Sequence, residues 1–234
     1  MAGQIGKTHG LHRRLWDRVH GLLGSTERAQ MKDAIRKRLM QAALAITMGA
    51  AGGVATHYAA QRPSDAVLLA MELGSYYESS GRHIGTPYID KLGKGQPLTV
   101  CNGVTGPEVV AGRTYSRDDC KRLELPKYME AERLARTAFK HWDTYNVWVR
   151  VSLIDMVYNL GPSVLDGTTL VRLGNAGDLV GMCQQMPRWV RGTVNGQSVV
   201  LPGLVDRRDT TRELCAEWGR DGHFSAGLIA RAQP

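Results

Sequence analysis

The stretch YIDKLGKGQPLTVCNGVTG, residues 88–106, decides the fold of this chain. Four glycines and one proline separate short runs of β-favouring residues within it, a composition typical of a hairpin with tight turns. Asp90 precedes the first glycine, and Thr99 lies on the far arm. Because glycines let the backbone bend tightly, the hairpin holds an acidic side chain and a hydroxyl in one small region. We therefore predict a small β lobe at about residues 82–125.

A helix is predicted directly before this lobe. Residues 65–79, DAVLLAMELGSYYES, follow Pro63 and Ser64, which are typical of a helix start. The helix is expected to end at residues 79–81, where two serines and a glycine follow one another. Its core face is expected at Val67, Leu68, Met71 and Leu73.

The segments after the hairpin also show helical patterns. A helix is expected from Ser116 onward, with an interruption at Pro126. Residues 146–161, NVWVRVSLIDMVYNLG, are apolar on most faces and predict a buried central helix. Two further segments, residues 169–186 and 205–219, complete a helical lobe. The predicted fold class is α+β, mainly α, with two lobes.

The N-terminal part of the chain has two segments of opposite character. Residues 1–38 carry nine Lys or Arg against three acidic residues, a net charge of +6 out of +8 for the whole chain. Residues 39–61, LMQAALAITMGAAGGVATHYAAQ, contain no Asp, Glu, Lys or Arg, and as a helix they would just span a bilayer. The run is only weakly hydrophobic because Ala, Gly and a few polar residues dominate it. We predict a basic helical leader at 1–38 on the cytoplasmic side, a weak signal-anchor-type transmembrane segment at 39–61, and a folded domain at 62–234.

Two other interpretations of residues 39–61 stay open. The run would also suit a buried helix of a globular protein, since periodicity alone does not separate the two. A cleaved signal peptide is the other interpretation, although no clear A-x-A site precedes Gln61 or Arg62. The basic leader by itself would suit a nucleic-acid-binding protein. Because its charge ends directly before an uncharged run, we favour a role in membrane topology.

All four cysteines lie after residue 100. An even number confined to the later part of the chain is typical of two disulfides formed in an oxidising compartment, and the alternative is four buried free thiols. We expect Cys101 to pair with Cys120, tying the hairpin to the helix after it, and Cys183 to pair with Cys215. No C-x-x-C pattern indicates zinc, and no metal or organic cofactor is expected.

Two carboxyl groups flank the predicted hairpin. Glu78 lies at the end of a helix and Asp90 lies before a glycine turn, so the two are placed on opposite walls of one region. Glycoside hydrolysis requires such a pair, with one carboxyl protonated and the other ionised. Lone acidic residues are more often solvated surface charges, so the pair alone is weak evidence.

The order of the motifs resembles the phage-type lysozyme family, glycoside hydrolase family 24. Glu78 is followed by Y-x-D-x-x-G and then by T-x-x-x-G-x-T-G. SLIDMVYNLG with TTLVRLGNAGD, and PRWVRGTVNGQSVVLPGLVDRRDTTRELC, are similar to later segments of the family. The resemblance covers about residues 66–220. It implies a lysozyme-like fold of two lobes and hydrolysis of the β-1,4 bond between N-acetylmuramic acid and N-acetylglucosamine in peptidoglycan, which lyses the host of a phage.

By position, the resemblance implies Glu78 as the general acid, Asp90 as the second carboxylate and Thr99 as the residue that helps place the attacking water. Eleven residues separate Glu78 from Asp90, and eight separate Asp90 from Thr99, where family members usually have about eight and five. Insertions in loops account for this difference. Glu72 is the alternative acid, and we favour Glu78 because it lies at the helix end.

The N-terminal segments resemble those of signal-anchor-release endolysins. The resemblance implies that residues 39–61 tether the enzyme to the host inner membrane and later leave it uncleaved, so that a monomer acts in the periplasm without nucleic acid. A non-catalytic protein that binds cell wall or nucleic acid is one alternative. A lytic transglycosylase is another, although a threonine at the water-placing position favours hydrolysis.

Overall fold

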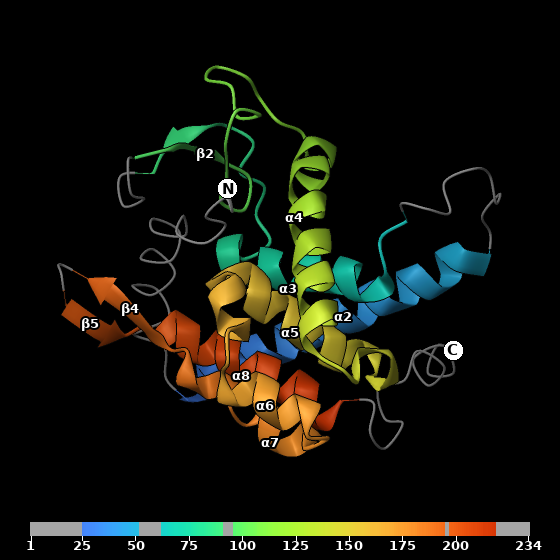
Figure 1. The fold of residues 1–234 in the computed structure, drawn as a ribbon. Helices are drawn as coiled ribbons and strands as arrows, with labels where there is room; N and C mark the ends of the chain where they lie inside the picture. Colours follow the sequence, from blue (N-terminus) through green and yellow to red (C-terminus); the bar gives the residue numbers. More distant parts are fainter. Residues whose placement is uncertain (1–24, 52–61, 91–95, 195–196, 219–234) are drawn as a thin grey trace.

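The computed structural model describes residues 25–51, 62–90, 96–194 and 197–218. A small lobe carries a three-stranded sheet, and a larger lobe is built from helices (Figure 1). Helix α4, Arg117–Ala138, runs from the small lobe down along the helical lobe. Each lobe has its own cluster of buried apolar side chains. The predicted two-lobed α+β fold is confirmed.

Helix α3, Asp65–Ser79, begins and ends as the sequence predicts. The Ser64 hydroxyl accepts a hydrogen bond of 3.1 Å from the Val67 amide, which caps the first turn. Ser80 follows in the left-handed conformation, with φ of 54°, and closes the last turn. Three of the four predicted core residues are buried, whereas Leu68 is only half-buried and Leu69 lies in the core instead.

The predicted interruption at Pro126 is wrong, because α4 continues through it. The helix starts with a capping box in which Ser116 and Asp119 bond to each other's backbone amides. Pro126 is exposed. A proline removes one intrahelical hydrogen bond, and packing of α4 against α3 and α5 offsets this loss.

Helix α5, Val147–Leu160, is the buried centre of the helical lobe, as predicted. The Asn146 side chain caps it by accepting from the Trp148 and Val149 amides. Between Trp148 and Asn159 only Arg150 is not buried. Three helices pack around α5, namely α3, α4 and α8, so residues from three other helices meet at its surface.

The rest of the helical lobe consists of short elements and one long helix. These are η1 Trp142–Thr144, η2 Pro162–Leu165, α6 Thr169–Asn175, α7 Leu179–Cys183, η3 Met186–Arg188 and α8 Pro202–Glu217. A second hairpin, β4 Arg191–Val194 with β5 Gln197–Val200, was not predicted. Its sequence signal was present, because an Asn-Gly pair at 195–196 between two β-favouring runs is typical of hairpins.

The small lobe carries three strands rather than a simple hairpin. Strand β1, Tyr88–Ile89, pairs antiparallel with β2, Leu98–Val100, and β2 pairs with β3, Val104–Thr105. The turn between β2 and β3 uses left-handed residues, with φ of 57° at Cys101 and 84° at Gly103. This turn brings Cys101 into the core of the small lobe. The glycines at 93 and 95 lie outside the described residues.

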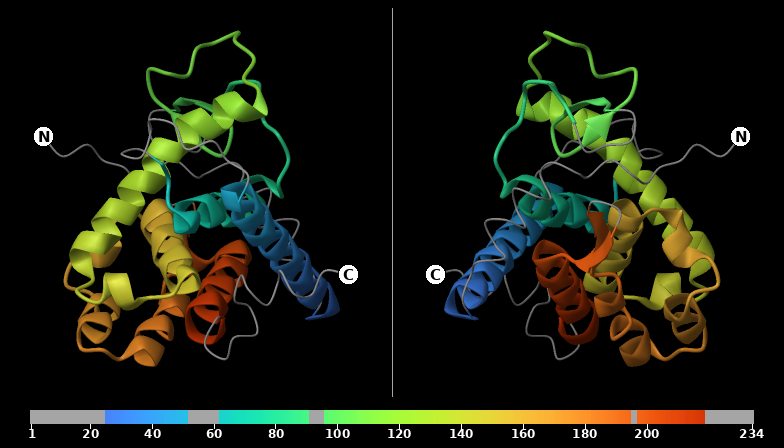
Figure 2. Two further views of the ribbon diagram at one scale, coloured as in Figure 1. Left: turned by 90° about the vertical axis from the view of Figure 1, so that its right-hand side faces the viewer. Right: turned by 90° about the vertical axis from the view of Figure 1, so that its left-hand side faces the viewer.

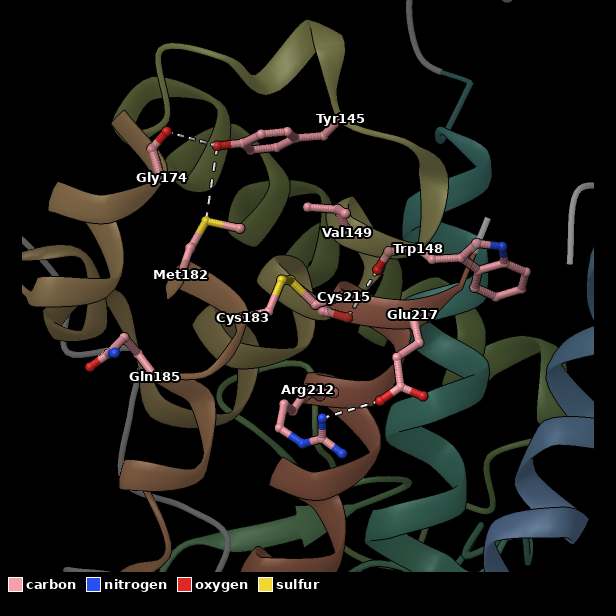
Figure 3. Close-up of a disulfide and its surroundings, with 12 residues drawn as sticks. Tyr145, Trp148, Val149, Gly174, Met182, Cys183, Gln185, Arg212, Cys215 and Glu217 are labelled. Carbon is pink, nitrogen blue, oxygen red and sulfur yellow. Dashed lines mark hydrogen bonds and ion pairs between the residues drawn. A yellow bond between two sulfur atoms is a disulfide. The ribbon is translucent and has the colours of Figure 1, made fainter. Parts of the chain in front are cut away.

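Both predicted cysteine pairs are disulfides in the structure. Cys101 bonds to Cys120 and ties the β2–β3 turn to the first turn of α4. Cys183 bonds to Cys215 and ties the end of α7 to α8 (Figure 3). All four cysteines are buried. Each lobe is therefore crosslinked within itself, and no free cysteine is found in the described part of the chain.

Helix α2, Ser25–Ala51, crosses the predicted boundary between leader and transmembrane segment. It lies at the edge of the helical lobe beside α3 and α8 (Figure 2). Ile35, Leu39 and Ala43 lie one turn apart on one face of α2, and all three are buried in the main core. In the described part of the chain, no helix has the length and hydrophobicity for a membrane span. Residues 1–24 and 52–61 of the predicted segments lie outside it.

Candidate active site

Glu78 lies in the last turn of α3 with 6% of its surface exposed. Its carboxylate accepts a hydrogen bond of 2.5 Å from Nη1 of Arg207 on α8. Arg207 is itself 3% exposed, so the pair is shielded from water on both sides. The first predicted site residue therefore sits in a low-dielectric setting in which charges interact strongly.

A second carboxylate shares the same guanidinium. Asp155 on α5, fully buried, accepts from Arg207 Nη2 at 2.7 Å and from Nε at 3.1 Å. Arg208 Nη2 donates to Oδ2 of Asp155 at 3.2 Å and to Oδ1 of Asn159 at 3.1 Å. Burial by itself would lower the pKa of Arg207, but the charges of Asp155 and Glu78 hold it well above its usual value. The site thus holds two buried guanidinium groups among buried carboxylates.

Asp90 and Thr99 lie in the small lobe, on either side of the β1–β2 connection. Asp90 follows β1, is 1% exposed, and donates its backbone N–H to the Pro97 carbonyl at 3.0 Å. Thr99 lies on β2, is fully buried, and donates its hydroxyl to the same carbonyl at 3.1 Å. Pro97 therefore ties both residues to one point of the backbone.

Tyr88 connects this pair to Glu78. In the β1–β2 register Tyr88 lies opposite Thr99. Burial raises the pKa of the Tyr88 phenol, and the negative charges of Asp90 and Glu78 raise it further. Both carboxylates are thus close enough to act on one phenol. The Tyr88 phenol thus responds to the charges of both predicted carboxylates, which come from two lobes, and Thr99 lies opposite Tyr88 in the sheet.

A further buried carboxylate lies on α4. Glu124 is 4% exposed and accepts from the backbone and side-chain nitrogens of Asn102, each at 3.1 Å. Burial raises the pKa of Glu124, Asn102 lowers it, and the charge of Glu78 raises it. These hydrogen bonds attach the Glu124 carboxylate to the β2–β3 turn, so we assign Glu124 a role in supporting that turn. Within the described residues, no group of three His, Cys, Asp or Glu side chains is arranged to hold a metal.

Glu72, the alternative acid, faces a different side of α3. Its carboxylate pairs with Nε of Arg38 on α2 at 2.9 Å, and about a third of each side chain is exposed. Five residues separate Glu72 from Glu78 along the helix, which turns the two side chains well away from each other. Glu72 therefore belongs to the contact between α2 and α3.

Several residues of this site were not predicted as such. The segments that contain Asp155, Arg207 and Arg208 resemble the family as a whole, and the sequence assigns no role to these three residues. The signal was a charged residue inside an otherwise apolar helix, since Asp155 lies in SLIDMVYNLG. A buried charge needs a partner of opposite charge, and the adjacent arginines of α8 supply it.

Comparison with known proteins identifies the family of the chain. A sequence profile of the family described as Phage lysozyme matches residues 83–211. The SAR-endolysin of Escherichia phage Mu is 34% identical over 191 residues, which cover 80% of this chain and 96% of the relative. The SAR-endolysin of Bacteriophage PS119 is 34% identical over 134 residues, covering 57% and 74%.

Solved structures show the same fold. An endolysin from Escherichia coli O157:H7 phage FAHEc1 has a TM-score of 0.57 and 19% identity, covering 69% of this chain and 97% of the other. The active form of the P1 phage endolysin Lyz has a TM-score of 0.54 and 22% identity, covering 75% and 92%. With the sequence match over more than half of its length, the chain belongs to the phage lysozyme family.

Proposed function

We propose that this chain is an endolysin that hydrolyses the β-1,4 bond between N-acetylmuramic acid and N-acetylglucosamine in the peptidoglycan of a bacterial host. The observation that carries the proposal is the buried Glu78, which lies at a helix end, accepts a hydrogen bond from the buried Arg207, and is accompanied by the buried Asp90 of the small lobe. Two carboxyl groups in one shielded region suit glycosidic bond cleavage. Membership of the phage lysozyme family supports the substrate class.

The residues divide the reaction between the two lobes. Glu78, from the helical lobe, donates a proton to the leaving glycosidic oxygen. Asp90, from the small lobe, stays ionised and stabilises the positive charge that develops on the sugar ring. The Thr99 hydroxyl donates its proton to Pro97, so its lone pairs remain to accept a hydrogen bond from the attacking water.

Substitution of Glu78 tests the proposal. Glu78→Gln keeps the side-chain shape and removes the proton donor, so turnover on purified peptidoglycan should fall by about a hundredfold or more. Glu72→Gln is the matched control, because it changes the same residue type on the same helix and should keep at least half of the activity. Full activity in Glu78→Gln together with its loss in Glu72→Gln would overturn the assignment.

Mass spectrometry of the released muropeptides separates hydrolysis from transglycosylation. Hydrolysis adds one water and leaves a reducing sugar, whereas a transglycosylase leaves an anhydro sugar without adding water. We expect reducing ends because the proposed role of Thr99 is to accept a hydrogen bond from the attacking water. Anhydro ends would support the alternative function.

The N-terminal segments support a membrane-tethered stage before release to the periplasm. The names of the relatives, SAR-endolysin, agree with such a stage, and residues 39–61 carry the uncharged run behind a basic leader. We infer that the host inner membrane holds the chain through residues 39–61 and that the released form is a monomer. A nucleic-acid-binding role is less suited, because two cations of the leader, Arg36 and Arg38, pair with Glu213 and Glu72.

A further inference from the structure

A pocket of about 450 Å³ lies among α2, α3, α4 and the small lobe. Glu78, Asp90 and Thr99 are not among its lining residues, so it is separate from the proposed catalytic site. The Cys101–Cys120 disulfide forms part of its wall. Its volume is in the range of pockets that hold small organic ligands.

One side of the pocket is apolar. Helix α2 contributes Ala42, Ala45 and Ile46, and helix α3 contributes Leu68 and Met71. Burial of such a surface by a ligand is favourable, at roughly 25 cal/mol for each Å² of apolar area removed from water. This side therefore suits a hydrocarbon chain.

The other side of the pocket is basic. Arg82 follows α3, while Arg117 and Lys121 lie one turn apart at the start of α4, and all three are exposed. Among the described residues, no carboxylate lies within ion-pair distance of these three cations. The two acidic residues of the lining are engaged elsewhere: Glu72 pairs with Arg38, and Glu124 accepts from Asn102. Three exposed cations thus line the pocket, and the structure pairs none of them with a carboxylate among the described residues.

We propose that this pocket binds an anionic phospholipid, with the phosphate at Arg82, Arg117 and Lys121 and part of one acyl chain against α2 and α3. Charge-assisted hydrogen bonds from Arg and Lys suit a phosphate, and the apolar side matches the hydrocarbon. An anionic ligand without a hydrocarbon chain, such as the stem peptide of peptidoglycan, would leave most of that side without a matching surface. The choice of a membrane lipid rests on the proposed tethering of residues 39–61. In that proposal the apolar α2 residues that line the pocket lie in the bilayer before release, so this side of the pocket comes from a lipid environment.

The position of the pocket predicts that lipid binding affects the packing of α2. Three of its apolar residues belong to α2, so the site is complete only while α2 is packed on α3. A ligand that binds only this arrangement shifts the population toward it. Lipid binding should therefore stabilise the form in which α2 is part of the folded domain.

Calorimetric titration of the purified full chain tests the proposal. The probe is lysophosphatidylglycerol below its critical micelle concentration, and lysophosphatidylcholine of the same chain length is the zwitterionic control. We expect one saturable site for the anionic lipid, with affinity at least about tenfold higher than for the zwitterionic one. Equal affinities would overturn the proposal.

Two variants locate the site. Arg117→Ala with Lys121→Ala removes two rim cations and should weaken binding by about tenfold or more. Lys140→Ala with Arg172→Ala removes two exposed cations outside the pocket and should leave the affinity within about twofold. Ala45→Phe fills the apolar side and should weaken binding without a loss of charge. An equal loss in both double variants, or an unchanged affinity in Ala45→Phe, would overturn the assignment.

Two further measurements separate this inference from the proposed function. Each variant is assayed on lipid-free peptidoglycan, where the pocket variants should keep wild-type activity, because none of the changed residues lies in the catalytic site. Absence of hydrolysis in the wild type would count against the proposed function and not against lipid binding. A soluble acidic muropeptide that displaces the lipid and binds more tightly would assign the pocket to the stem peptide and overturn the lipid proposal.

Discussion

Arg207 is the residue on which the charge balance of the site depends. It contacts Glu78 and Asp155 at once, and Arg208 contacts Asp155 from the same helix. A general acid must hold its proton before the reaction, and a protonated Glu78 no longer neutralises Arg207. Asp155 then supplies the remaining counter-charge. We infer that Asp155 is a positioning residue that makes the protonated form of Glu78 accessible.

Removal of the Asp155 charge should shift the dependence of activity on pH. In Asp155→Asn, protonation of Glu78 would remove the charge of both carboxylates that bond to the buried Arg207, which costs more than in wild type. The alkaline limb of the activity profile should therefore shift to lower pH by about one unit. Glu124 and Asp90, the other carboxylates around Glu78, and the phenols of Tyr88 and Tyr158 are unchanged in this variant. The measurement is the rate of peptidoglycan hydrolysis between pH 4 and 9.

A second substitution separates charge from shape. Asp155→Asn combined with Arg208→Gln restores the balance of buried charge and should return the limb toward its wild-type position. Asp143→Asn, at an exposed carboxylate, is the control and should not move it. If Asp155→Asn loses activity equally at every pH and its alkaline limb does not shift, Asp155 acts through structure alone. Thermal melts of each variant verify folding.

At the scale of elements, α2 is held to the domain mainly by its apolar face. Ile35, Leu39 and Ala43 are buried, whereas its ion pairs are partly exposed, with Arg38 at 32% and Glu72 at 35%. Ion pairs exposed to this extent contribute about 0–1 kcal/mol each. Apolar burial therefore decides whether α2 packs.

Leu39→Ala tests the packing of α2 in the lipid-free protein. Leu39 is fully buried, so the free energy of unfolding should fall by about 2–5 kcal/mol. Gln41→Ala, on the exposed face of the same helix, should change it by less than about 0.5 kcal/mol. Urea unfolding gives both values. If the two variants unfold at the same concentration, α2 is not part of the released domain.

The two disulfides act within separate lobes, and the second one stabilises the helical lobe. Cys183 and Cys215 are 32 residues apart, and closing a loop of that length contributes roughly 3 kcal/mol in the chain-entropy model. Cys183→Ser with Cys215→Ser should lower the stability of the oxidised protein by about this amount. The melting temperature with and without reductant verifies it. A wild-type protein whose melting temperature is the same in reductant would contradict the expectation.

At the scale of the whole molecule, the proposed function places the same α2 residues in two environments, first the membrane and then the folded protein. Residues 39–51 form part of a helix packed on α3 in the structure, and the proposed tether places them in lipid. Low hydrophobicity suits both, because Ala and Gly pack closely against a neighbouring helix and lose little on leaving the bilayer.

Substitutions in this run should shift the partition between membrane and periplasm. Gly52→Leu with Gly53→Leu raises apolar area and helix propensity, so more enzyme should stay in the membrane fraction. Ala51→Lys places a charge in the run, at a cost of about 2.5–3.5 kcal/mol in mid-membrane, so less should stay there. Fractionation and immunoblotting of host cells measure the ratio. Wild-type protein found only in the cytosol, or shortened by about 60 residues, would contradict the tether.

Local sequence patterns were sufficient for most of the fold. The cap at Ser64, the apolar faces of α3 and α5, and the glycine-rich stretch each depend on neighbouring residues, so their elements were predictable. The spacing of Glu78, Asp90 and Thr99 gave the candidate site only with the family resemblance, because isolated acidic residues carry little information. The course of α4 was misjudged, since tertiary packing offsets the cost of Pro126.

The sequence by itself determined helices α3 and α5, the start of α3 at Ser64, the small β lobe, the number of cysteines and the basic leader before an uncharged run. Only the tertiary structure decided which groups meet. Arg207 lies 129 residues from Glu78 along the chain, and Asp155 lies 52 residues from Arg207. It also decided that Glu72 faces α2 while Glu78 faces α8. The physical reason is that caps and periodicity act over a few residues, whereas pairing of buried charges depends on the packing of helices far apart in sequence.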